Sequence, residues 1–186
     1  MDKNDILTGN IFSALTALAL PIMGTSFVHM AYHLVDMIWI GILGSDAVAS
    51  IGIAGYFIAF SMALTRLIQV GTEVNVAQNV GAGKENHASA YAASSFRLAL
   101  GMAIVYGFLL LVLKNQLIAF FQINNSSLES SASDYLSIMA FGMPFIFINP
   151  IITCIYNGSG SSKDPFKVNS MGMAANLVLD PLFRVC

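Results

Sequence analysis

Long apolar segments alternate with short polar ones along the whole chain. The apolar segments predict helices at residues 10–43, 47–79, 88–113, 128–156 and 166–186. A helix that crosses a bilayer needs about 20 mostly apolar residues, so the first four are long enough to span and the fifth covers part of a span. The pattern therefore predicts an all-α integral membrane protein with four complete transmembrane helices and part of a fifth.

The composition fits this interpretation. The chain is 56% hydrophobic and 10% charged, with a mean hydropathy of +0.74, whereas soluble domains carry about 25% charged residues. A net charge of −2 without a basic stripe argues against a nucleic-acid partner and leaves the lipid bilayer as the surroundings. Because no linker rich in Pro, Gly or Ser divides the helices, we expect residues 1–186 to form one partial transmembrane lobe.

The lysines of the polar segments predict an orientation. Four of them fall on one side of the membrane when the predicted helices are counted, and the fifth falls on the other side. The four are Lys3, Lys84, Lys163 and Lys167, and the fifth is Lys114. By the positive-inside rule, the N-terminus is expected to be cytoplasmic in a multi-pass protein of the plasma membrane.

Asp36 interrupts the first apolar segment, which has no charged residue from Ile6 to Val35. A carboxylate at the centre of a membrane helix costs about 2.5–3.5 kcal/mol, so it persists mainly where it faces a cavity or a partner. Asp36 is therefore a candidate functional residue. The alternative is that it lies near the interface and reaches water.

Helix geometry places two further polar residues at a similar depth. Asp36 is about 12 Å from the turn at Gly44, and Tyr135 is about 12 Å from the same side of the membrane. Asp180 is about 21 Å into its helix from the opposite side, in the same half of a core about 30 Å thick. These three residues predict one shared pocket, although Tyr135 could instead belong to an interfacial aromatic belt.

The last predicted helix adds an oxygen-rich face. Asn176 and Asp180 stand four residues apart and therefore share one face of the helix. Their oxygens suit a small hard cation, and Pro181 frees the carbonyl of Leu177 nearby. The pair could also simply bind a neighbouring helix. In the first helix, Pro21 permits a bend, although prolines are common in membrane helices.

The sequence gives little sign of a zinc site or of catalytic residues. His29 and His33 share a helix face, but no Cys, Glu or third His lies near enough in sequence to complete a zinc site. No Ser-His-Asp order or nucleophile elbow occurs, so neither an enzyme nor a bound cofactor is expected.

Four segments resemble the multidrug and toxic compound extrusion (MATE) transporters, in that family's order. They are Leu34–Gly52, Gly71–Lys84, Tyr135 with Gly142–Phe145, and Asn176–Leu182. The resemblance implies most of one six-helix lobe of a twelve-helix, two-lobed fold. Members that resemble this chain export cationic or amphipathic compounds in exchange for Na⁺ or H⁺. We therefore expect the amino-terminal fragment of such an antiporter, in a bacterial inner membrane, with a missing carboxy-terminal lobe needed for transport.

The resemblance also implies roles for individual residues. By motif position, Asp36, Tyr135, Asn176 and Asp180 match the family's cation site, and Pro21 matches the proline at which the first helix bends. Two alternatives stay open. One is a lipid-linked sugar flippase of the same superfamily, and the other is an intramembrane aspartyl protease built on Asp36 and Asp180, which would need a carboxylate dyad that shares a proton.

Overall fold

The computed structural model describes residues 11–42, 44–122 and 125–185, with the side chains of residues 14, 178 and 180–185 left outside the description. Five helices account for almost all of these residues, and there is no strand among them. The helices are α2 (Ile11–Ile42), α3 (Ser45–Gly81), α4 (Glu85–Ala119), α5 (Ser126–Gly158) and α6 (Lys163–Val185). The first four are long and apolar enough to cross a membrane, which confirms the predicted fold class.

Four helices, α3 to α6, extend beyond their predicted limits, and the largest difference is at the end of α4. α4 is predicted to end at Leu113 but continues to Ala119. The extra turns contain Lys and Gln, which are good helix formers. Lys114 and Asn115 in these turns also form hydrogen bonds with serines of α5. α6 begins at Lys163 instead of Phe166. Its first turn accommodates Pro165, since the N–H that proline lacks has no helical partner at that position.

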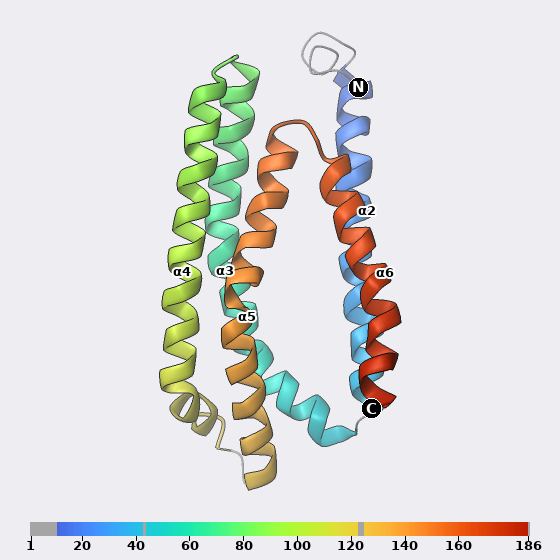
Figure 1. Ribbon diagram of the computed structural model, residues 1–186, viewed down its shortest axis with the longest axis vertical. Helices are drawn as coiled ribbons and strands as arrows, with labels where there is room; N and C mark the ends of the chain where they lie inside the picture. The colour runs from blue at the N-terminus through green and yellow to red at the C-terminus, as the bar shows by residue number, and fades with distance from the viewer. Residues whose placement is uncertain (1–10, 43, 123–124, 186) are drawn as a thin grey trace.

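The helices form two groups (Figure 1). α3, α4 and α5 pack together, with α5 against both of the others, while α2 and α6 lie side by side. α2 touches α3 only slightly, and α6 touches α5 only slightly. The chain is therefore a three-helix group and a two-helix group joined by short connections.

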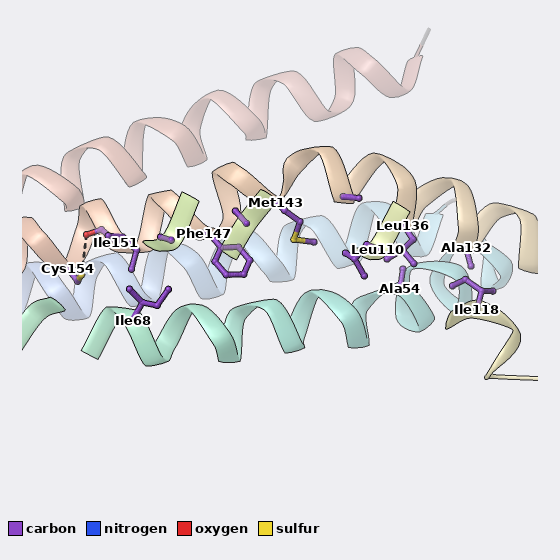
Figure 2. Close-up of a cluster of buried hydrophobic side chains, with 13 residues drawn as sticks. Ala54, Ile68, Leu110, Ile118, Ala132, Leu136, Met143, Phe147, Ile151 and Cys154 are labelled. Carbon is purple, nitrogen blue, oxygen red and sulfur yellow. Dashed lines mark hydrogen bonds between the residues drawn. The ribbon is translucent and has the colours of Figure 1, made fainter. Parts of the chain in front are cut away.

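Small residues allow the three-helix group to pack closely. Figure 2 shows its buried side chains converging from α3, α4 and α5. A Cβ at Gly107 of α4 would lie 2.8 Å from the carbonyl oxygen of Ala140 on α5, and one at Gly158 would lie 2.9 Å from the carbonyl oxygen of Glu73 on α3. Membrane helices associate through such close backbone approaches, because burying apolar area offers little gain in lipid.

The two-helix group is aligned in parallel. Near the start of α6, the Ser162 hydroxyl donates a hydrogen bond to the Leu18 carbonyl of α2 at 3.3 Å. One turn further on, the ring of Phe166 fills the space beside Gly24, where a Cβ would lie 2.7 Å from the ring. Residues later in α6 thus meet residues later in α2, so both helices run in the same direction (Figure 1).

Candidate cation site between α2, α5 and α6

The site begins on α2, where Tyr32 and Asp36 stand one turn apart. Residues four apart lie above one another on a helix face, so the phenol and the carboxylate point to the same side. Both side chains are partly exposed. They are therefore accessible to a ligand from the space beside α2.

α6 contributes Asn176. Its carboxamide Nδ2 donates a hydrogen bond to the Tyr32 phenol oxygen at 3.4 Å. The bond occupies the nitrogen end of the carboxamide, so the carbonyl oxygen is left as an acceptor. Asn176 is thereby held beside the Asp36 face of α2.

α5 contributes Tyr135 from the three-helix group. Its ring is half-buried, and it lies close enough to Asp36 and Tyr32 to interact electrostatically with both. The structure therefore places Tyr135 within electrostatic range of Asp36, on a helix that belongs to the other group.

Asp180 and Pro21 are the remaining predicted residues, and fewer of their contacts are described. Asp180 lies one turn after Asn176 in α6, but its side chain is outside the described residues. Pro21 lies inside α2, which continues through it from Ile11 to Ile42. The Thr25 hydroxyl donates to the Pro21 carbonyl at 3.0 Å and so satisfies part of the backbone near the proline.

Sequence reasoning missed Tyr32. The signal was present, because Tyr32 precedes Asp36 by one helical turn and has the same oxygen chemistry as Tyr135. Tyr32 is the residue that joins the others, since it bonds to Asn176 and also interacts with Tyr135.

The gathered groups share one kind of chemistry. A carboxylate, two phenol oxygens and a carboxamide oxygen are hard oxygen donors, which suit small hard cations. A carboxylate in such a place can equally bind a proton. Among the described residues, no three His, Cys, Asp or Glu side chains gather closely enough to hold a transition metal.

Two cavities lie away from these residues. One, of about 610 Å³, is lined by apolar and aromatic side chains of α3, α4 and the turn after α4. The other, of about 200 Å³, lies between α5 and α6 and includes Asn149, Asp164 and Asn169. Neither lining includes Asp36 or Tyr135.

Two known proteins resemble this chain over most of its length. The probable multidrug resistance protein YpnP of Bacillus subtilis is 24% identical over 184 residues, which is 98% of this chain and 41% of that protein. The probable multidrug resistance protein NorM of Thermotoga maritima is 25% identical over 166 residues, or 89% of this chain and 36% of that protein. The chain thus spans about two fifths of the length of these relatives.

Solved structures agree with the fold. A crystal structure of a MATE protein in complex with MaL6 superposes with a TM-score of 0.91 at 26% identity, covering 98% of this chain and 41% of that one. An outward-facing multidrug resistance MATE transporter of the MOP superfamily gives a TM-score of 0.86 at 24% identity. This second likeness concerns the fold alone.

A family model settles the membership. The MatE model matches residues 21–182, which is most of the chain and includes all of α3, α4 and α5 and most of α2 and α6. Its limits enclose Pro21, Asp36, Tyr135, Asn176 and Asp180. This multi-pass membrane chain belongs to the MATE family of multidrug transporters.

Proposed function

We propose that the chain forms the cation-binding part of a multidrug antiporter that exchanges Na⁺ or H⁺ for small cationic or amphipathic compounds. The observation that carries the proposal is the gathering of Asp36, Tyr32, Tyr135 and Asn176 from three helices. A carboxylate at membrane depth is a functional residue by default. The relatives are named as probable multidrug resistance proteins, which supports drugs as the transported compounds.

Ion and drug would compete for the same charge. When Asp36 is ionised, it offers a counter-charge to a cationic drug. A bound Na⁺ would use the carboxylate together with the oxygens of Asn176 and a tyrosine, while a proton would neutralise the carboxylate directly. Either event lowers the affinity for the drug, and reciprocity requires that the drug lowers the affinity for the ion by the same factor.

The division into two helix groups suggests how the competition could move the protein. Tyr32, Asp36 and Asn176 belong to the α2–α6 group, whereas Tyr135 belongs to the three-helix group. An ion that Asp36 and Tyr135 both coordinate would hold the groups together at this level, and a drug there would hold them apart. Pro21 precedes the site residues in α2 and offers a place at which the helix can bend.

The test is the substitution Asp36→Asn, made in the protein as it is expressed in its natural host. The amide keeps nearly the same shape but can neither lose a proton nor neutralise a cation. We expect ion-driven efflux of a cationic dye from membrane vesicles to be abolished for both Na⁺ and H⁺ gradients, with unchanged amounts of protein in the membrane. Dye export equal to that of the unmodified protein would refute the proposal.

Glu129→Gln is the matched control, because it removes one carboxylate from the first turn of α5 and leaves the site untouched. It should export the dye normally.

The direction of transport rests on a cytoplasmic N-terminus in a bacterial inner membrane, which is part of the proposal.

A further inference from the structure

Lys114 is a basic residue within a membrane-spanning helix, half-buried where α4 packs against α5. Its ammonium donates a hydrogen bond to the Ser137 hydroxyl at 3.0 Å. An ammonium has three N–H donors, so two remain for another acceptor. In the part of the chain that the structure describes, no carboxylate is paired with it.

Three neighbours continue this polar contact along the boundary of α4 and α5. The Ser137 hydroxyl donates onward to the Ser133 carbonyl at 2.8 Å, and the Ser133 hydroxyl lies 3.4 Å from the Asn115 carboxamide oxygen. We call Lys114, Asn115, Ser133 and Ser137 the polar seam. Asp134 lies between the two serines in sequence, but its carboxylate is exposed and makes no ion pair with the seam lysine.

The polar seam lies near one end of the helices. Lys114 is about 8 Å from the end of α4, measured along the helix. α5 has 33 residues and is therefore about 50 Å long, which exceeds a hydrocarbon core of about 30 Å by roughly 10 Å at each end. The seam thus falls near the boundary between headgroups and hydrocarbon, where a lysine stem can extend toward the phosphate level.

Apolar side chains lie further along both helices, toward the middle of the membrane. Phe108 of α4 is 65% exposed and Phe141 of α5 is 73% exposed. A ligand that fits this arrangement has a negatively charged group at the seam and hydrocarbon chains beside the phenylalanines. An anionic phospholipid has both.

We propose that the polar seam binds the headgroup phosphate of an anionic phospholipid, whose acyl chains extend along the side of Phe108 and Phe141. Charge complementarity carries the assignment. The half-buried ammonium has a neutral hydroxyl as its partner, and a phosphate supplies the missing negative charge and several strong acceptors. Basic pockets between transmembrane helices bind anionic lipid headgroups on the cytoplasmic side of membranes, and Lys114 offers the same charge interaction at this seam.

The experiment uses the full chain in detergent, titrated with dioleoylphosphatidylglycerol and followed by native mass spectrometry. Lys114→Met keeps an apolar stem and removes the charge. We expect it to weaken lipid binding about fivefold, the effect of one basic residue at the membrane surface. Lys84→Met removes the same charge from the α3–α4 turn and should leave the affinity unchanged. Equal weakening by both substitutions, or none by Lys114→Met, would overturn the proposal.

Two further titrations use the unsubstituted chain, so they decide even if Lys114→Met fails to fold. Dioleoylglycerol has the same acyl chains without the phosphate, and we expect it to bind at least about fivefold more weakly. Inorganic phosphate has the charge without the chains and should not displace the phospholipid. Equal binding of the two lipids, or displacement by inorganic phosphate, would contradict phospholipid recognition.

Discussion

The Asn176 carboxamide on α6 donates a hydrogen bond to the Tyr32 phenol oxygen on α2, with 3.4 Å between the nitrogen and the oxygen. At this contact a polar residue of the two-helix group meets the residue that stands one turn before Asp36. The hydrogen bond is long, and interhelical hydrogen bonds in membranes average about 0.6 kcal/mol. Its contribution is therefore expected in ligand affinity more than in stability.

Tyr32→Phe tests that expectation. The substitution removes the phenol oxygen and keeps the ring, so Asn176 loses its partner and the site loses one oxygen donor. We expect a higher ion concentration for half-maximal dye efflux, with transport retained at saturating ion. Tyr56→Phe is the control, because Tyr56 is 68% exposed on α3 and lies in the lining of the apolar cavity. Equal ion dependence in Tyr32→Phe and the unmodified protein would count against a role for Tyr32.

The α2–α6 group can be tested through Gly24. A Cβ there would lie 2.7 Å from the Phe166 ring, so Gly24→Val forces the ring and the helix apart. Overpacking of this kind costs about 1–3 kcal/mol, and we expect a lower thermal midpoint by circular dichroism in detergent. Gly41→Val on the same helix meets nothing within 4 Å and should have little effect.

A second substitution makes the Gly24 result specific. Phe166→Leu removes the ring that the new side chain meets, so Gly24→Val with Phe166→Leu should recover part of the lost midpoint. Two substitutions in contact are expected to be non-additive in this way. Strictly additive losses would show that the two residues do not meet.

The three-helix group has an equivalent position on α4. A Cβ at Gly107 would lie 2.8 Å from the Ala140 carbonyl oxygen, and backbone cannot move aside as a side-chain end can. We expect Gly107→Ala to lower the thermal midpoint of the chain. Gly101→Ala on the same helix meets nothing within 4 Å and should raise it slightly, since Ala favours a helix over Gly by about 1 kcal/mol. Opposite signs for one chemical change identify the close contact of α4 and α5.

Hydrophobic pattern alone was enough for the helices, because each apolar run is long compared with the bilayer. Depth counting from the turns also placed Asp36 and Tyr135 at one level, and in the structure they lie within electrostatic range of each other. The division into an α2–α6 pair and a three-helix group could not be predicted. Small residues occur on all of these helices, and the choice of partner depends on single close fits such as Gly24 with Phe166.

The last prediction concerns orientation. The start of α2, the α3–α4 turn and the α5–α6 turn lie at one end of the structure (Figure 1), so Lys84, Lys163 and Lys167 gather there, while Lys114 lies toward the other end. Because basic residues accumulate on the cytoplasmic side, we expect the α4–α5 turn to be external.

Single cysteines in a Cys154→Ala, Cys186→Ser background test this orientation. Asn86→Cys and Ser126→Cys report on the two ends, since both positions are exposed. Ser126 is preferable to Asn125, whose side chain caps α5 by accepting hydrogen bonds from the Ser127 and Leu128 amides. With intact cells and a membrane-impermeant maleimide, we expect Ser126→Cys to be labelled and Asn86→Cys to be labelled only after permeabilisation. The reverse pattern would invert the orientation and place the polar seam of Lys114 in the cytoplasmic leaflet.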